Sequence, residues 1–226
     1  MLKISVIIPV LNEECNLEKT LTKVQQDQDV EIIVVDGGSK DGTVEIAKKY
    51  GVKVIVSPQP GRSFQMNFGA KEAVGDILLF LHGDTILPGG YSQKIIAAFT
   101  KTKTIAGAFE LGIDGEGFSL RLVEKAVNWR SRFLYLPYGD QAMFVKASVF
   151  WELGGFPNLP IMEDFVFIRQ LKSLGTIAII PTPVITSGRR WQKLGVWKTT
   201  LLNQGIVMGY YLGVSPERLA RWYRRQ

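Results

Sequence analysis

Cysteine and histidine are nearly absent from this chain of 226 residues, which contains one of each, Cys15 and His82. A single cysteine excludes an internal disulfide and fits a reducing cytoplasm. No histidine lies near Cys15 in the sequence, so we do not expect its thiol to act as a nucleophile. A lone histidine is usually structural, and a functional role for His82 depends on its neighbours.

Long apolar runs are missing as well. The nearest to one, residues 199–214, contains Asn203 and Gln204 and is shorter than the roughly 18–20 residues that a membrane-spanning helix needs. The apolar start of the chain is interrupted by Lys3 and leads into an acidic segment, unlike a signal peptide. The sequence therefore predicts a cytoplasmic protein that is soluble or attached peripherally to the inner face of the membrane.

Acidic residues are scarce in the last part of the chain. The net charge of +6 favours anionic partners such as nucleotide phosphates or an anionic membrane. After residue 188 the only acid is Glu217, and the basic residues are Arg189, Arg190, Lys193, Lys198, Arg218, Arg221, Arg224 and Arg225. No nucleic-acid recognition motif accompanies this charge, so nucleic acid is not an expected partner.

The first hundred residues alternate between short apolar runs typical of strands and amphipathic segments typical of helices. This pattern predicts an α/β fold in which helices flank a mainly parallel sheet, with the carboxyl ends of the strands gathered at one edge. The expected strands are residues 4–10, 31–36, 52–56 and 76–81, and the expected helices lie near 15–25, 41–50, 64–74 and 90–100.

The alternation changes after residue 104. Strands are expected at 105–113, 141–146 and 176–180, a strand-like piece at 184–186, and helices at 120–132 and 164–174. Since no linker or repeat divides the chain, we interpret residues 1–190 as one domain. It has a nucleotide-binding half (1–103) and an acceptor half (104–190), and a helical, basic and aromatic tail (191–226) follows.

Asp36 ends the second expected strand and precedes the glycines Gly37 and Gly38. A carboxylate at this place can accept hydrogen bonds from a ribose or a base, and the glycines allow a ligand to approach the backbone closely. The turn after the first strand contains Asn12, Glu13 and Glu14 in place of a glycine-rich sequence, which argues against NAD or FAD.

Asp84 follows a buried strand and can hold a hard divalent cation such as Mg²⁺ or Mn²⁺. His82 stands two residues before it, so both side chains would project the same way if the strand continued. Imidazole suits Mn²⁺ better than Mg²⁺. His82 is therefore a candidate ligand beside Asp84.

Three further segments each admit a plain and a functional interpretation. Arg62 lies at a helix start, where it suits a phosphate, or it is an exposed surface arginine. Glu163 and Asp164 also open a helix, either as caps or as a carboxylate that accepts a proton from an attacking hydroxyl. Residues 189–191 either neutralise a diphosphate and offer Trp191 to a sugar face, or form an ordinary basic surface.

In order and spacing, these segments resemble the family 2 glycosyltransferases of GT-A fold over nearly the whole chain. Within this family the chain looks similar to a subgroup of short bacterial enzymes with His-x-Asp at the metal site. The matching stretches are residues 5–13, 34–43, 61–62, 65–67, 81–85, 154–156, 163–164 and 189–191.

The resemblance implies an inverting, metal-dependent transfer of a hexose from a nucleotide-diphosphate sugar, expected to be a UDP-sugar, to an unknown hydroxyl acceptor. It implies Asp164 as the general base and Asp84 as the ligand of Mn²⁺ or Mg²⁺, with His82 in place of the usual first aspartate. The implied nucleotide contacts are Pro9, Glu13, Asp36, Arg62, Asn67 and Gly83. Glu163, Arg190 and Trp191 are implied at the diphosphate and acceptor.

Two other functions stay open at this stage. A sugar nucleotidyltransferase would have a glycine- and arginine-rich loop after its first strand, which is not found here. A non-catalytic nucleotide-sugar binding protein would have less need of Asp84 and Asp164. The tail has two interpretations of equal weight: peripheral contact with a membrane, where a lipid acceptor would lie, or packing on the domain or on a homodimer partner.

Overall fold

A computed structural model describes residues 2–100 and 103–224 of the chain. In this part of the chain the strands form one eight-stranded sheet in the order β3-β2-β1-β4-β7-β6-β8-β5. The strands are β1 (Ile4–Val10), β2 (Val30–Asp36), β3 (Lys53–Val56), β4 (Ile77–Phe80), β5 (Thr85–Ile86), β6 (Thr104–Ile113), β7 (Met143–Lys146) and β8 (Thr176–Thr186).

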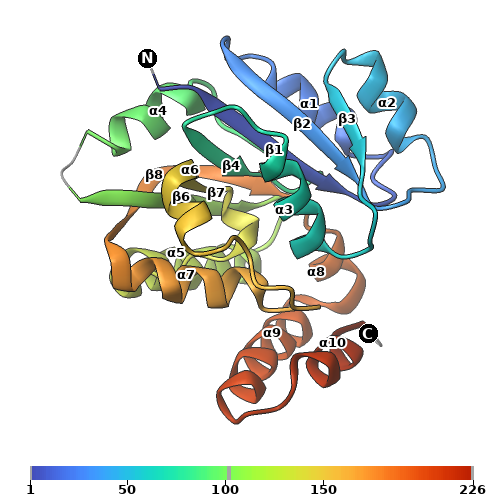
Figure 1. The fold of residues 1–226 in the computed structure, drawn as a ribbon. Helices are drawn as coiled ribbons and strands as arrows, with labels where there is room; N and C mark the ends of the chain where they lie inside the picture. The colour runs from blue at the N-terminus through green and yellow to red at the C-terminus, as the bar shows by residue number, and fades with distance from the viewer. Residues whose placement is uncertain (1, 101–102, 225–226) are drawn as a thin grey trace.

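Helices cover both faces of this sheet (Figure 1). They are α1 (Leu17–Val24), α2 (Thr43–Lys49), α3 (Arg62–Lys71), α4 (Tyr91–Ala98), α5 (Phe118–Leu134), α6 (Ala147–Glu152), α7 (Glu163–Leu174), α8 (Arg189–Leu194), α9 (Val196–Tyr211) and α10 (Pro216–Arg224). A short 3-10 turn, η1, spans Gly139–Gln141. The α/β fold with a mostly parallel sheet is confirmed.

The first four strands of the sheet order are parallel, because β1 pairs with β2 and β4 and β2 pairs with β3 in the same direction. Ile7 lies opposite both Ile33 and Phe80, so the strands end close to one another. The loops after β1, β2 and β4 therefore meet at one edge. These loops carry Glu13, the turn after Asp36, and Asp84.

The side chains of β1 point alternately into the two layers of the core. Val6 and Ile8 belong to a buried cluster with α1, α2 and α4, whereas Ile7 belongs to a cluster with α3, α6 and α7. Side chains of successive strand residues point to opposite faces, so a continuous apolar strand can be covered on both sides. Gly69 lets α3 approach closely, since a Cβ there would lie 2.6 Å from Ile7 Cγ2.

The structure adds elements that the sequence pattern did not predict. β5 and α6 are too short for a periodic signal to emerge. Residues 176–180 and 184–186, expected as separate pieces, form the single strand β8. The register against β6 shifts where Phe109 pairs with Ile180 and Glu110 with Pro183, and this irregularity lets the strand accommodate its prolines.

The C-terminal helices pack on the domain beneath the start of α7 (Figure 1). Ile206 of α9 and Leu219 of α10 share a buried cluster with Met162 and Phe165. Every helix within residues 2–100 and 103–224 is too short or too polar to span a lipid bilayer. One side of the tail thus packs on the domain, and contact of its other side with a membrane or with a homodimer partner stays a prediction.

Candidate active site

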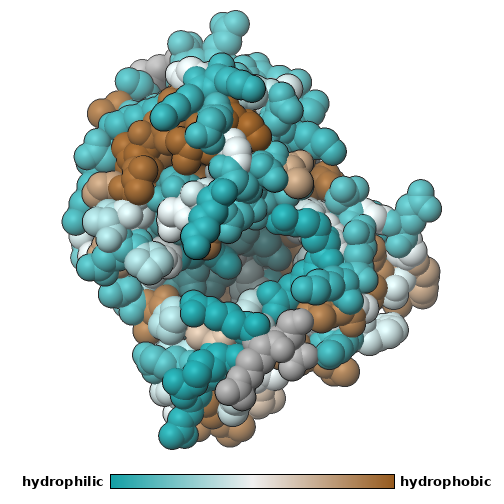
Figure 2. All heavy atoms as spheres, turned by 90° about the vertical axis from the view of Figure 1, so that its right-hand side faces the viewer, coloured by the Kyte–Doolittle hydropathy of each residue, from teal (hydrophilic) through white to brown (hydrophobic). Residues whose placement is uncertain are grey.

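A cleft of about 1100 Å³ opens between the carboxyl edge of the strands, the start of α7, and the helices α8 to α10. Figure 2 shows a hollow in this side of the molecule, ringed mainly by hydrophilic side chains. This volume slightly exceeds the roughly 300–1000 Å³ that is typical of small-molecule pockets. It suits a ligand as large as a nucleotide sugar.

Most of the residues that the sequence predicted for the site line this one cleft. Those brought together are Pro9, Glu13, Arg62, His82, Gly83, Asp84, Glu163, Asp164, Arg190 and Trp191. The cleft is also lined by Asp140, Arg189 and Tyr223, which the resemblance did not imply as site residues. Asp36 and Asn67 were predicted as nucleotide contacts, but they are not part of the lining.

Asp36 is buried and acts on the turn that follows it. Its carboxylate accepts hydrogen bonds from the backbone N–H of Gly38 at 2.8 Å and of Ser39 at 3.0 and 3.2 Å. Gly38 has a φ of 95°, a conformation that glycine adopts readily. In this structure Asp36 thus shapes the loop next to the cleft, and a direct contact with ribose stays a prediction.

Asn67 clamps the loop before α7. Its side-chain N–H₂ donates to the carbonyl of Phe156 at 2.8 Å, and its carbonyl accepts from the N–H of Phe156 at 2.9 Å. Both ends of the amide are therefore engaged. The geometry gives Asn67 a structural role that the resemblance alone did not reveal.

Asp84 and Glu13 converge on one cation, the guanidinium of Arg189. Arg189 Nη2 lies 2.8 and 2.9 Å from the two carboxylate oxygens of Glu13 and 3.0 Å from Asp84 Oδ2. The partners are 176 and 105 residues away in the sequence. For this reason the sequence pattern could mark Arg189 as basic but could not show what it binds.

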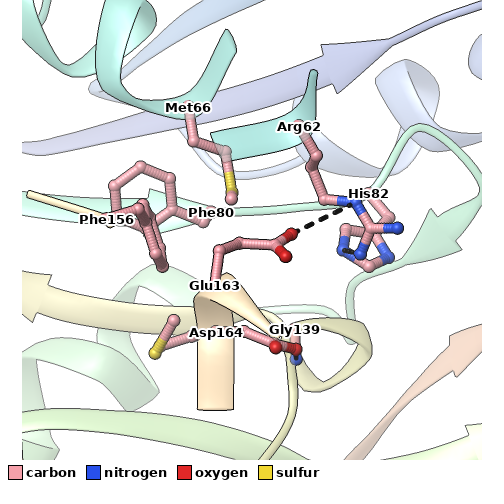
Figure 3. Close-up of a pocket in the computed structure, with 9 residues that line it drawn as sticks. Arg62, Met66, Phe80, His82, Gly139, Phe156, Glu163 and Asp164 are labelled. Atoms are coloured by element: carbon pink, nitrogen blue, oxygen red, sulfur yellow. Dashed lines mark hydrogen bonds and ion pairs between the residues drawn. The ribbon is translucent and has the colours of Figure 1, made fainter. Parts of the chain in front are cut away.

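His82 has different partners from Asp84, because β4 ends at Phe80 and the chain turns before Asp84. His82 Nε2 lies 3.4 Å from Arg62 Nη1 (Figure 3). Burial, and then the charge of Arg62, lowers the pKa of His82 to about 3. The imidazole is therefore neutral at physiological pH, and its role as a metal ligand stays a prediction.

Glu163 is 5% exposed and faces Arg62 in a small recess lined by Met66, Phe80 and Phe156 (Figure 3). Its Oε1 lies 3.7 Å from Arg62 Nε. Burial raises the pKa of Glu163 above its ordinary value, although Arg62 opposes this shift. Burial alone would lower the pKa of Arg62, but the carboxylates of Glu163 and Asp164 raise it.

Asp164 is held by backbone groups. Its Oδ2 accepts a hydrogen bond from the N–H of Gly139 at 2.7 Å, and its Oδ1 accepts one from the N–H of Phe165 at 2.7 Å. A Cβ on Gly139 would lie 3.0 Å from Asp164 Oδ2 and 3.3 Å from His82 Nε2. Gly139 is thus the spacer that lets the turn η1 come close to both side chains.

Three buried side-chain atoms of the described residues have no hydrogen-bond partner, and all three belong to residues that line the cleft. They are Asp140 Oδ1, Arg190 Nε and Trp191 Nε1. Burial raises the pKa of Asp140 to about 6, with Arg130 acting in the opposite direction. Buried polar atoms are normally paired, so one acceptor and two donors remain for a ligand or for water.

The residues also fit a divalent cation. In the described ranges no three His, Cys, Asp or Glu side chains cluster as a preformed metal site. Glu13 and Asp84 nevertheless already surround one positive group, and Mg²⁺ commonly uses one or two carboxylates together with substrate phosphates. The two carboxylates thus already bind a positive group, and a Mn²⁺ or Mg²⁺ site at Asp84 stays a prediction.

Comparison with known proteins gives the site its context. Residues 5–152 match the profile of a family described as glycosyl transferase family 2. Glycosyltransferase AglE of Haloferax volcanii is 28% identical over 170 residues, which are 69% of this chain and 56% of AglE. The chain thus spans little more than half of that relative.

Two solved structures share the fold. S. aureus TarS residues 1–349 in complex with UDP-GlcNAc has a TM-score of 0.68 at 20% identity, covering 82% of this chain and 58% of that one. Glucosyl-3-phosphoglycerate synthase from Mycobacterium tuberculosis, in complex with Mn²⁺, UDP-glucose and phosphoglyceric acid, has a TM-score of 0.62 at 21% identity. This match covers 82% of this chain and 71% of that one.

Proposed function

The chain belongs to glycosyl transferase family 2, and from this membership we propose that it transfers a sugar from a nucleotide-diphosphate sugar to a hydroxyl acceptor with inversion. One observation carries the proposal: Asp164, held by the N–H of Gly139, lines the same cleft as Asp84, Arg62 and Arg190. A proton acceptor and a set of charges for a diphosphate thus share one space. The donor is a UDP-sugar, as in both related structures.

Asp164 is the general base of this proposal. The acceptor oxygen bonds to the anomeric carbon, its proton passes to Asp164, and the bond from that carbon to the diphosphate oxygen breaks. This single displacement needs one base and inverts the configuration. The two backbone N–H groups fix the carboxylate, and positioned proton transfer contributes typically about 10²–10⁴-fold to a rate.

When its bond to the anomeric carbon breaks, the leaving diphosphate gains one negative charge in addition to the charge it already carries, and the cleft must stabilise this charge. Arg62, Arg189 and Arg190 line the cleft, and the unpartnered Nε of Arg190 is available as a donor. A Mn²⁺ or Mg²⁺ ion held by Asp84 and Glu13, with His82 nearby, would supply further charge neutralisation when bound. Pro9, Glu13 and Gly83 form the wall for the nucleotide, next to the loop that Asp36 shapes.

Asp164→Asn tests this function. Release of UDP from a panel of UDP-sugars, with Mn²⁺ and candidate acceptors, is measured for the wild type and the variant. We expect a loss of about 10²–10⁴-fold in turnover, with UDP affinity by calorimetry unchanged. The matched control is Asp114→Asn, an exposed acid outside the cleft. Full activity of Asp164→Asn removes this residue from the mechanism.

We also propose that the acceptor is presented at a membrane surface, because two neighbouring helices each expose an apolar stripe. The stripes have the same spacing of residues, and α5 and α9 pack against each other. We call them the α5–α9 face, which consists of Phe118, Leu122, Trp129 and Phe133 on α5, Trp197, Leu201 and Met208 on α9, and Leu212 directly after α9.

Basic side chains accompany this face, which favours an anionic lipid surface over a neutral partner. Exposed Arg121, Lys125 and Arg132 flank the stripe of α5, and Lys198 stands beside Trp197. Aromatic and basic residues together are typical of helices that lie at a membrane interface. A membrane contact here would use α5 as well as the tail that the sequence had suggested.

Co-sedimentation with vesicles of anionic and of neutral lipid tests the contact. We expect the wild type to bind anionic vesicles, and the double variant Trp129→Glu/Trp197→Glu to lose binding. Val56→Glu, which changes an exposed apolar residue on β3, is the control and should still bind. The opposite outcome is that the wild type fails to bind anionic vesicles and forms a dimer that the double variant does not form. This outcome would overturn the membrane contact and assign the α5–α9 face to a second copy of the chain.

A further inference from the structure

Arg189 occupies a built cation position. Its Nη2 nitrogen contacts three carboxylate oxygens, two from Glu13 and one from Asp84, at 2.8 to 3.0 Å. The acids come from the loops after β1 and β4, and the arginine opens α8. Three separate chain segments thus converge on one positive group inside the cleft.

The backbone of Arg189 is anchored next to Asp84, while its side chain is free to leave. Thr85 pairs with Thr186 between β5 and β8, and the N–H of Ser187 donates to the carbonyl of Asp84 at 3.1 Å. The Arg189 side chain is 51% exposed, compared with 19% for Glu13 and 22% for Asp84. The carboxylates are therefore the fixed part of this contact and the guanidinium is the exchangeable part.

The guanidinium stays charged in this position. An arginine guanidinium is protonated at any physiological pH, and this one donates its hydrogen bonds to the carboxylates of Glu13 and Asp84. A permanent positive charge on these two carboxylates repels any second cation that approaches the same oxygens. A metal ion therefore cannot use Glu13 and Asp84 fully while Arg189 remains bound to them.

We infer that Arg189 is an internal counter-ion that holds the metal site of the free protein and withdraws from it when a metal ion and a diphosphate bind together. The inference rests on the proposed function for the identity of the diphosphate. The diphosphate provides a new partner for the displaced guanidinium, since arginine binds phosphate oxygens with two parallel hydrogen bonds. Arg189 is thus a positioning residue that couples metal binding to donor binding.

Mn²⁺ binding without any nucleotide tests the first half of the inference. Free Mn²⁺ is followed by electron paramagnetic resonance during titration of the wild type, Arg189→Ala and Arg189→Gln. Removal of the competing charge should tighten Mn²⁺ binding by about tenfold or more. Arg189→Gln keeps most of the length of the side chain, so it reports the charge even if the alanine variant folds poorly.

Two controls locate the effect. Lys193→Ala removes a basic side chain from the same helix that also lines the cleft, and it should leave Mn²⁺ affinity unchanged. Asp84→Asn added to Arg189→Gln should abolish the gain, since it removes one of the two carboxylates. If both Arg189 variants bind Mn²⁺ with the same affinity as the wild type, the inference is overturned.

UDP affinity in the presence of Mn²⁺ tests the second half. The Arg189 variants should bind UDP more weakly than the wild type although they bind Mn²⁺ more tightly. If Arg189 had only a structural role, its variants would change the affinities for Mn²⁺ and for UDP in the same direction. That outcome would contradict the coupling. None of these measurements involves sugar transfer, so the inference and the assignment of Asp164 as base can fail separately.

Discussion

The two sides of the cleft hold their key carboxylates in different ways. Asp84 is bound by the guanidinium of Arg189, a half-exposed side chain from the C-terminal helices. Asp164 is bound by the N–H of Gly139 and of its own neighbour Phe165. A side-chain partner can exchange for another cation, whereas a backbone partner cannot move without its turn. Asp84 is therefore prepared to exchange its partner, whereas Asp164 is prepared to keep a fixed position.

Among the changes that test this comparison, Gly139→Ala should have the largest effect, which is on kcat. The new Cβ would lie 3.0 Å from Asp164 Oδ2, so the carboxylate would have to shift by a few tenths of an ångström. Misplacement of a catalytic group by about 1 Å can cost on the order of 10²-fold, so this smaller shift should lower kcat by about tenfold. Steady-state kinetics check this, and an unchanged kcat would show that the backbone does not fix the base.

Gly83→Ala probes the opposite side and should have a smaller effect. Its Cβ would lie 3.0 Å from Val10 Cγ1 and 3.3 Å from Glu13 Cγ, which are side-chain atoms that can give way. We expect a few-fold rise in the KM for the donor, with kcat nearly retained. A loss of kcat as large as that of Gly139→Ala would mean that both sides are equally rigid.

The smallest expected effect concerns His82 and is on the pH dependence of the stability of the fold. Its pKa in the folded protein, about 3, lies below the ordinary 6.5 because of burial and Arg62. When the pH falls below about 6.5, the unfolded chain takes up a proton that the folded protein refuses until about pH 3. The wild type therefore loses stability as the pH falls through this window. The His82→Gln variant has no imidazole to protonate, so it should lose less stability than the wild type over the same range. Melting temperatures between pH 7.5 and 4.5 check this, and parallel curves would contradict it.

The sequence predicts much of the fold because its signals are local. The strands and helices of the first hundred residues emerge from continuous apolar runs and amphipathic periods, and the structure confirms them apart from shifts of a few residues at their ends. The strand β5 was missed since two residues carry no period. The sequence also placed the carboxyl ends of β1 and β4 at one edge, which brought Glu13 and Asp84 together.

The contacts of the site depend on segments that are distant in the chain. Arg189 meets Asp84 across 105 residues, and Asn67 meets Phe156 across 89. Neither contact has a local signature, so Asn67 was assigned a nucleotide role by resemblance and no partner could be predicted for Arg189. The tail, expected as an appendage from residue 191, contributes Trp191 and Tyr223 to the wall of the cleft. The division at residue 190 stays a prediction.

The short pairing between β5 and β8 has a consequence for folding. It joins Thr85 to Thr186 and places Arg189 next to Asp84, so it must close a loop of about a hundred residues before the cleft can form. Contacts of such long sequence separation form slowly, whereas β1, β2 and their connecting helix are close in the chain. We expect the ion pair of Arg189 to be among the last native contacts acquired during refolding, and its appearance to mark the completed protein.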